Sequence, residues 1–162
     1  MRSQPLISLL SVIALLLCNL TAYSGEEAAV GKKAPALELP DQHDKNCKLD
    51  ASTRVVIIAF HMGVAKSFNK WLNAREKDWL KKRNAIYVAD ISGMPSTIAK
   101  MFAVPKMRKY KHQILLNRAD EFASKFPVEK EKATVLRINK SGMITSISHI
   151  ASPESLPRTL GE

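Results

Sequence analysis

Cysteine is scarce in this chain, and its scarcity restricts the chemistry that the protein can perform. The sequence has two cysteines, Cys18 and Cys47. Cys18 lies in an apolar N-terminal stretch that we expect to be removed, so Cys47 would remain as the only thiol and no intramolecular disulfide could form. A single remaining thiol is either a buried, inert residue or a free reactive one.

Glycine is also rare, with six residues in the whole sequence. None of them has the spacing of a phosphate-binding loop or a dinucleotide-binding fingerprint, and no nucleic-acid-binding motif is present. The chain carries a formal net charge of +10. This charge suits an anionic surface or an acidic partner protein, although dispersed lysines also keep proteins soluble. We expect no nucleic acid partner, no cofactor and no metal.

The first 24 residues have the features of a secretory signal peptide. Arg2 supplies a positive charge, residues 6–17 form an apolar core, and residues 22–24 (Ala-Tyr-Ser) fit a cleavage site with small residues. The apolar core is shorter than the about 20 residues that cross a bilayer, which favours cleavage over an uncleaved anchor. We therefore predict an exported protein, periplasmic or secreted, with no transmembrane span after cleavage and a single domain over residues 25–162.

A lipid anchor is an alternative fate for the N-terminal segment. Leu15-Leu16-Leu17-Cys18 resembles a bacterial lipoprotein site. Such sites need a small residue directly before the cysteine, and Leu17 is not small. Cleavage near residue 24 is therefore the preferred prediction, with lipidation of Cys18 as the alternative.

The centre of the domain is predicted to be a strand, a short turn and a helix. Residues 55–60 are continuously apolar and largely β-branched, which is typical of a strand buried on both faces of a sheet. Residues 61–66 form the turn. Apolar residues then recur at helical spacing and predict a helix over 66–83. The turn stands at the carboxyl end of a central strand, where open α/β sheets usually place their chemistry.

Further elements follow in regular order. We expect a strand over 85–89 that ends at Asp90, a helix over about 96–103 that Val104-Pro105 terminates, a short strand near 113–117 and a helix over 119–126. Two strands, 134–139 and 143–150, are joined by a hairpin turn. Asp90 should lie at the same sheet edge as His61. Together they form either a general-base pair, with only Ser92 as a neighbouring nucleophile, or a hydrogen-bonded pair that fixes the loops.

The turn after the central strand resembles the active site of thioredoxin. In that family the strand leads into Cys-Gly-Pro-Cys-Lys, whereas this chain has Met62-Gly63-Val64-Ala65-Lys66. Gly63 and Lys66 match, while Met62 and Ala65 replace the two cysteines. The family also has a cis-proline followed by Thr at the start of a later strand. Residues 132–142 resemble that strand and its turn, with Ala133 in place of the proline and Thr134 retained.

Residues 31–39, Gly-Lys-Lys-Ala-Pro-Ala-Leu-Glu-Leu, resemble the opening of the peroxiredoxin and periplasmic thiol-reductase branch of the thioredoxin-like superfamily. The resemblance covers about residues 31–150. It implies a thioredoxin-like α/β fold with a central mixed sheet and helices on both faces. It also implies a degenerate active-site groove that could bind a partner protein but has no catalytic residues for thiol chemistry. The residues assigned to this groove are His61, Met62, Gly63, Val64, Ala65, Lys66, Asp90, Ala133 and Thr134.

Three hypotheses of function follow from these observations. In the preferred one, the chain is not a thiol–disulfide enzyme and acts by binding a partner through the degenerate groove. In the second, it is a peroxiredoxin-like redox enzyme that uses Cys47, although Cys47 precedes the central strand, whereas a peroxidatic cysteine begins the following helix. In the third, it carries Cu(I), which prefers thioether and imidazole ligands. The ligands would be His61, Met62, Met94, Met101 and Met107. Separately, the basic run 106–112 could contact an anionic surface.

Overall fold

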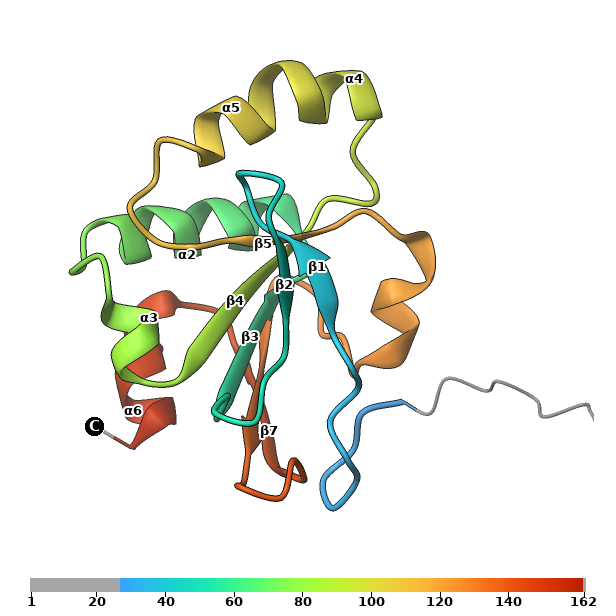
Figure 1. The fold of residues 1–162 in the computed structure, drawn as a ribbon, viewed down its shortest axis with the longest axis vertical. Coiled ribbons are helices and arrows are strands. Elements are labelled where there is room, and N and C mark those ends of the chain that lie inside the picture. The colour runs from blue at the N-terminus through green and yellow to red at the C-terminus, as the bar shows by residue number, and fades with distance from the viewer. Residues whose placement is uncertain (1–26, 162) are drawn as a thin grey trace, which may run out of the picture.

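The computed structural model describes residues 27–161 (Figure 1). The predicted signal peptide, its cleavage site and Cys18 lie outside the described residues. Within residues 27–161 no helix is long and apolar enough to cross a membrane.

A five-stranded mixed sheet forms the centre of the molecule (Figure 1). Its strand order is β5-β4-β3-β6-β7; β3, β4 and β5 are parallel, and β6 and β7 are antiparallel to their neighbours. The strands are β3 (Val55–Ala59), β4 (Ala85–Asp90), β5 (Leu115–Asn117), β6 (Ala133–Ile138) and β7 (Ile144–Ile150). Each residue of β3 is buried, because helices and a hairpin cover the two faces of the sheet. The prediction of a mixed sheet around this strand is confirmed.

Helices cover one face of the sheet. These elements are α2 (Met62–Asn73), α3 (Trp79–Lys82), α4 (Ser96–Ile98), the π-helical turn η1 (Ala99–Ala103), α5 (Val104–Met107), the short 3-10 turn η3 (Pro153–Ser155) and α6 (Leu156–Leu160). Their apolar side chains join alternate residues of the strands in one core cluster, which includes Ile57, Phe68, Leu72 and Tyr87. Burial of each such side chain contributes about 1.5–3 kcal/mol to folding.

A small hairpin and a 3-10 helix cover the other face. The hairpin strands are β1 (Glu38–Pro40) and β2 (Asn46–Lys48), which pair antiparallel, and the 3-10 helix is η2 (Asp120–Lys125). Here the second core cluster gathers the side chains that point away from α2, among them Val56, Ile58 and Leu136, with Phe122 and Phe126 beside them. The alternation of β3 residues between two clusters explains why its sequence is apolar without a break.

The segment before β3 also pairs with the outer edges of the sheet. The Ile144 N–H donates to the Lys32 carbonyl, and the Gly31 N–H donates to the Ile144 carbonyl, each at 2.8 Å. At the opposite edge, the Gln42 N–H donates to the Ile114 carbonyl at 3.1 Å, and the Gln42 side-chain oxygen accepts from the Ile114 N–H at 2.8 Å. Both outer edges of the sheet therefore form hydrogen bonds with this segment.

The prediction of one helix over 66–83 was wrong in two respects, the position of its start and its continuity. α2 begins at Met62, and the chain leaves the helix after Asn73 before α3 forms. At the break, the Arg75 N–H donates to the Leu72 carbonyl in a tighter turn. Trp71 and Trp79 then meet edge to face, with ring centroids 5.1 Å apart. The two indoles are spaced as on one continuous helix, so the apolar pattern gave no sign of the break.

Val104-Pro105 does not end the helix that starts near residue 96. η1 closes on the Val104 N–H, which donates to the Ala99 carbonyl, and α5 continues directly. Pro105 therefore stands in the first turn of α5, directly after the π-helical turn. Residues 96–107 form one continuous helical segment, called here the 96–107 helix. The predicted helix over 119–126 is the 3-10 helix η2.

Candidate functional site

The first turn of α2 holds the residues that replace the thioredoxin cysteines. β3 ends at Ala59, His61 adopts an extended conformation as the N-cap residue, and α2 begins at Met62. The His61 side chain makes no capping hydrogen bond, and the first turn contains no acidic residue. The first N–H groups of a helix have no intrahelical acceptor, and they carry the positive end of the helix dipole. This end of α2 is therefore open to an acceptor from outside.

Met62 and Ala65 point to different surroundings. The Met62 side chain is 70% exposed, whereas Ala65 is buried against the core. The Ala65 carbonyl accepts a hydrogen bond from the Tyr87 hydroxyl at 3.4 Å. Lys66 is exposed on the same turn. Neither the thioether of Met62 nor the methyl group of Ala65 can form a thiolate, so this turn cannot perform thiol–disulfide exchange.

A cleft of about 430 Å³ opens beside the first turn of α2. We call it the α2 cleft. His61, Gly63, Val64 and Ser67 line it from the α2 side, and Lys130, Glu131 and Ala151 line it from the loops that flank the sheet. The structure thus brings three residues of the predicted groove, His61, Gly63 and Val64, to one cleft.

Two residues of the predicted groove contribute no surface to it. Ala133 and Thr134 are fully buried within β6. Ala133 pairs with Ala59 of β3, and the Thr134 hydroxyl donates to the Pro127 carbonyl at 2.8 Å. Both side chains lie inside the sheet and not on an open surface, because both faces of the sheet are covered at the start of β6. Lys130 and Glu131, which the sequence did not single out, take their place.

Asp90 is held by Asn117 instead of His61. Its Oδ1 atom accepts from the Asn117 side-chain amide and from the Ser92 N–H, each at 2.9 Å. Asn117 is buried and also bonds to both the carbonyl and the N–H of Ala119. This arrangement ties together the ends of β4 and β5. Asp90 is therefore a loop-fixing residue, as one of the two predicted alternatives stated, but its partner was misidentified.

Cys47 lies on the opposite face of the sheet from α2. It is in β2, is half-buried, and packs against the cluster that contains Val56 and Ile58. Its sulfur accepts a hydrogen bond from the Gln113 side chain at 3.2 Å. Burial, reinforced by the charge of Asp41, raises the pKa of the Cys47 thiol. This environment disfavours the thiolate that peroxide or disulfide chemistry requires.

The methionines of the copper hypothesis occupy different environments. Met62 begins α2, whereas Met101 and Met107 lie on the 96–107 helix, where Met101 is exposed and Met107 is buried. Met94 packs against the core from the loop before that helix. Within residues 27–161, no three His, Cys, Asp or Glu residues are placed to hold a metal ion.

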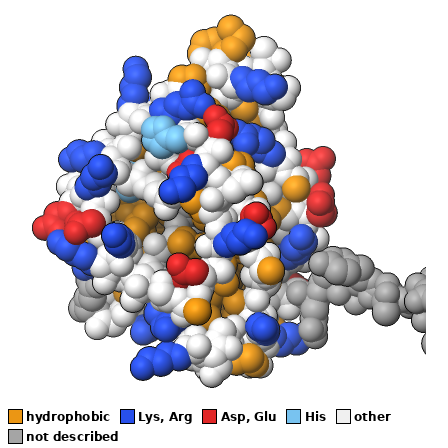
Figure 2. Space-filling model, viewed as in Figure 1, with side chains coloured by type: hydrophobic (Ala, Val, Ile, Leu, Met, Phe, Trp, Pro, Cys, Tyr) orange, Lys and Arg blue, Asp and Glu red, His pale blue; other side chains and the backbone are white. Residues whose placement is uncertain are grey.

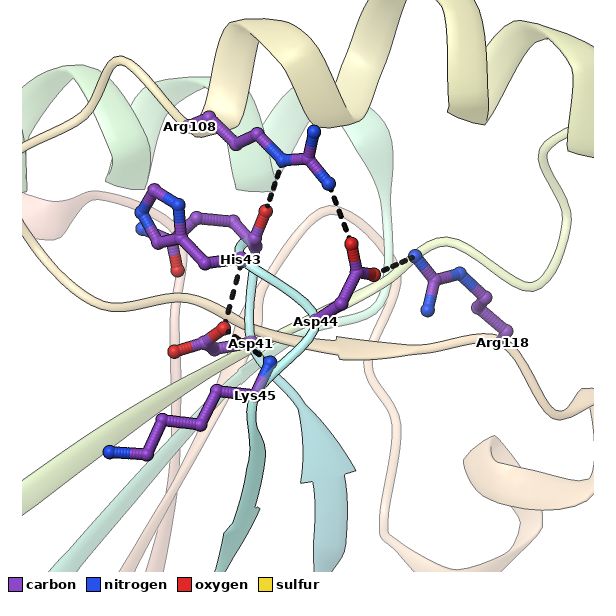
Figure 3. A network of polar contacts seen from close by, with 7 residues as sticks. Asp41, His43, Asp44, Lys45, Arg108 and Arg118 are labelled. Atoms are coloured by element: carbon purple, nitrogen blue, oxygen red, sulfur yellow. Dashed lines mark hydrogen bonds and ion pairs between the residues drawn. The ribbon is translucent and has the colours of Figure 1, made fainter.

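A polar network around the β1–β2 turn was not predicted (Figure 3). The Arg108 Nε donates to the Gln42 carbonyl at 2.8 Å, and its terminal nitrogen pairs with Asp44 at 2.6 Å. Arg118 reaches the other oxygen of Asp44 at 4.0 Å. Figure 3 shows both arginines converging on Asp44 from separate parts of the chain. The network fastens the end of the 96–107 helix to the hairpin.

Asp41 and Gln42 form the buried base of the same turn. Burial tends to raise the pKa of Asp41, but hydrogen bonds from the Gln113 side chain and from the Lys45 and His43 N–H groups outweigh it and lower the pKa. The Gln42 amide donates to the His112 carbonyl at 2.8 Å. In the sequence these residues form only a polar turn cluster. Their burial depends on the distant segment 108–113, which local sequence patterns do not reveal.

No family model and no curated protein sequence matches this chain. Solved structures do match it. A peroxidoxin BcpB from Mycobacterium tuberculosis superimposes with a TM-score of 0.55 at 16% identity, covering 83% of this chain and 94% of that one. The thioredoxin domain of a thiol-disulfide oxidoreductase from Bacteroides vulgatus gives 0.55 at 14% identity, covering 83% and 97%. A thio-disulfide isomerase from Thermus thermophilus gives 0.52 at 15% identity, covering 82% and 95%.

The chain is therefore a thioredoxin-like protein in its fold. The solved structures that it resembles include both peroxiredoxins and thiol–disulfide oxidoreductases. The likeness is one of fold. In this chain the first turn of α2 contains Met62 and Ala65 and no cysteine.

Proposed function

We propose that this protein is an exported, non-catalytic thioredoxin-like protein that binds a partner protein at the α2 cleft and at Met62, which stands between the cleft residues His61 and Gly63 in the chain. The observation that carries the proposal is Met62, which is 70% exposed at the first position of α2. Thiol–disulfide exchange requires a thiolate at this position. A thioether does not ionise in this way and forms no disulfide, so the exposed side chain is available for contact but not for catalysis.

The surroundings of Met62 suit a polypeptide partner. Methionine is flexible and polarizable, and it adapts to differently shaped apolar surfaces. The open N–H groups of the first turn can donate to a carbonyl or carboxylate of the partner. On the rim of the cleft, Lys130 and Glu131 are both exposed and offer one charge of each sign. The expected ligand is an extended segment with an apolar side chain beside an acceptor group.

Export is the second part of the proposal, and it rests on the sequence of residues 1–24. The single positive charge, the apolar core and the small residues at 22–24 are typical of a secretory signal. Removal of this segment would leave Cys47 as the only thiol. A half-buried thiol with a raised pKa is compatible with an oxidising compartment, because it reacts slowly.

An insulin-reduction assay tests the loss of catalysis. The full chain should not reduce insulin, whereas Met62→Cys combined with Ala65→Cys should introduce reductase activity, because it places two thiols at the start of α2. Met62→Ser combined with Ala65→Ser is the matched control and should stay inactive. Reduction by the unmodified chain at a rate near that of thioredoxin would refute the proposal. If the double-cysteine variant is inactive, the first turn of α2 is not equivalent to the active-site turn of thioredoxin.

Site-specific photocrosslinking tests the binding surface. Benzoylphenylalanine at position 62 should give a discrete crosslinked product in the producing cells, whereas the same group at position 128, an exposed position outside the cleft, should not. Glu131→Lys should abolish the product, and Glu121→Lys, on the 3-10 helix η2, should leave it unchanged. Equal products from positions 62 and 128 would contradict binding at the α2 cleft.

A further inference from the structure

The 96–107 helix exposes an unusual amount of apolar surface. Of the large apolar side chains that are exposed within residues 27–161, three belong to this helix: Ile98 at 45% exposure and Met101 and Phe102 at 63% each. Positions three and four residues apart share one side of a helix. These three side chains therefore form one outward-facing patch, called here the outer patch.

The opposite side of the same helix is buried. Ala99, Val104 and Met107 pack into the core cluster that α2 also joins. A helix on a protein surface normally has one apolar side and one polar side. This helix has apolar residues on both its inward and its outward side. Packing against the core explains the apolar residues of the inward side, but nothing in the described residues covers those of the outward side. In Figure 1 the helix lies at the edge of the molecule, beyond α2.

Positive charge surrounds the outer patch. Residues 91–119 contain no Asp or Glu and six basic residues. Arg108 and Arg118 contact Asp44. The other four have no carboxylate within ion-pair distance in the part of the chain that the structure describes; they are Lys100, Lys106, Lys109 and Lys111, all exposed. Figure 2 shows hydrophobic side chains projecting at the upper edge of the molecule, with lysine or arginine side chains beside them.

We propose that the outer patch docks this protein onto an anionic lipid bilayer. An interfacial helix binds such a surface by placing its apolar side chains below the headgroups while flanking lysines contact lipid phosphates. The 96–107 helix has both parts: Ile98, Met101 and Phe102 for insertion, and Lys100 and Lys106 on either side of the two most exposed of them. The patch projects from the surface, which suits insertion into a soft interface better than capture of a small ligand.

This inference is independent of the α2 cleft. The residues that line the cleft do not belong to the 96–107 helix, so the vesicle experiment below can fail while the photocrosslinking experiment succeeds, and the reverse. Together the two surfaces would let the protein bind a partner while it stays at a membrane.

Vesicle co-sedimentation tests the proposal with the protein recovered from the exported soluble fraction. The probes are vesicles of phosphatidylcholine alone and vesicles of equal parts phosphatidylcholine and phosphatidylglycerol. We expect binding to the anionic vesicles only, weakened by salt because exposed charges are screened. Met101→Gln combined with Phe102→Gln should lower the partition coefficient at least about tenfold. Val30→Gln combined with Val128→Gln, which alters exposed apolar residues elsewhere, should leave it unchanged.

A charge-matched pair completes the test. Lys100→Gln combined with Lys106→Gln should weaken binding about thirtyfold, since each lysine near an anionic surface contributes on the order of 1 kcal/mol. Lys33→Gln combined with Lys140→Gln removes the same charge at exposed positions away from the helix and should have little effect. Absence of vesicle binding, or equal effects of the target and control variants, would overturn the proposal. A dimer that the Met101/Phe102 variant abolishes, without vesicle binding, would replace the bilayer by a second copy of the chain.

Discussion

Protonation of His112 should destabilise this protein between neutral and mildly acidic pH. His112 is 3% exposed, and its Nε2 donates to the Asn69 Oδ1 atom at 3.0 Å. The other ring nitrogen, Nδ1, is buried and has no hydrogen-bond partner. A second proton would have to sit on Nδ1, in an apolar setting between Tyr87 and Tyr110. Burial accordingly lowers the pKa of His112 from 6.5 to about 4.

The sign and size of the effect follow from this lowered pKa. In the unfolded chain the imidazole takes up a proton below pH 6.5, whereas in the folded protein it does so only below about pH 4. The contribution of neutral His112 to stability is therefore complete above pH 6.5 and is lost as the pH falls towards 4. At about 1.4 kcal/mol for each pH unit, the loss is about 3 kcal/mol. Asp41 and Asp50, whose pKa values are lowered below 3.8, add to acid destabilisation mainly at lower pH.

Urea unfolding at a series of pH values, followed by tryptophan fluorescence, measures this loss. His112→Gln removes the titrating group and keeps an amide that can donate to Asn69, so its stability should vary with pH by about 3 kcal/mol less than that of the unmodified protein between pH 7 and 4. His43→Gln, at an exposed histidine, is the control and should keep the full pH dependence. Parallel pH profiles for the unmodified protein and His112→Gln would refute the reasoning.

Two further predictions concern Cys47 and Asn117. The Cys47 thiol should react with a disulfide reagent far more slowly at neutral pH than free cysteine, because its pKa is raised, and Cys47→Ser should leave peroxide consumption unchanged; rapid reaction in the folded state would contradict this. Asn117→Ala should lower the free energy of unfolding by about 1–3 kcal/mol, since it removes the buried amide that donates to Asp90. Chemical denaturation would measure the change, with the exposed Asn46→Ala as the control; equal stability of the two variants would show that the Asp90 contact contributes nothing.

The central strand and the turn region after it were predictable because their signals are local, although the helix itself begins at Met62 and not at residue 66. A run of β-branched residues, Val55 to Ile58, has few alternatives to a buried strand, and Gly63 and Lys66 mark the turn of a known family. The positions of the later strands were predicted from local apolar patterns together with the same resemblance. These parts of the fold depend on neighbouring residues or on a motif, and the sequence displays both directly.

The features of the fold and of the site that the sequence did not predict depend on contacts between distant segments of the chain. Nothing near Asp90 in the sequence indicates that Asn117 would hold it, because that contact forms only when β5 aligns beside β4. The helix was expected to end at Val104-Pro105, because the π-helical turn that lets Pro105 open α5 has no sequence signature. The burial of Gln42 likewise requires His112, seventy residues further along the chain.

Residues 31–32 and 42 form backbone hydrogen bonds at the two outer edges of the sheet, and this pairing has a consequence for self-association. β7 and β5 are its outermost strands, and an unpaired outer strand offers free N–H and carbonyl groups to any other extended chain. The segment before β3 adds no strand to the central sheet, yet it occupies part of each border. Trimming the protein to its five-stranded centre would therefore expose these edges and produce a molecule prone to aggregation. The segment before β3 thus helps to keep the protein soluble.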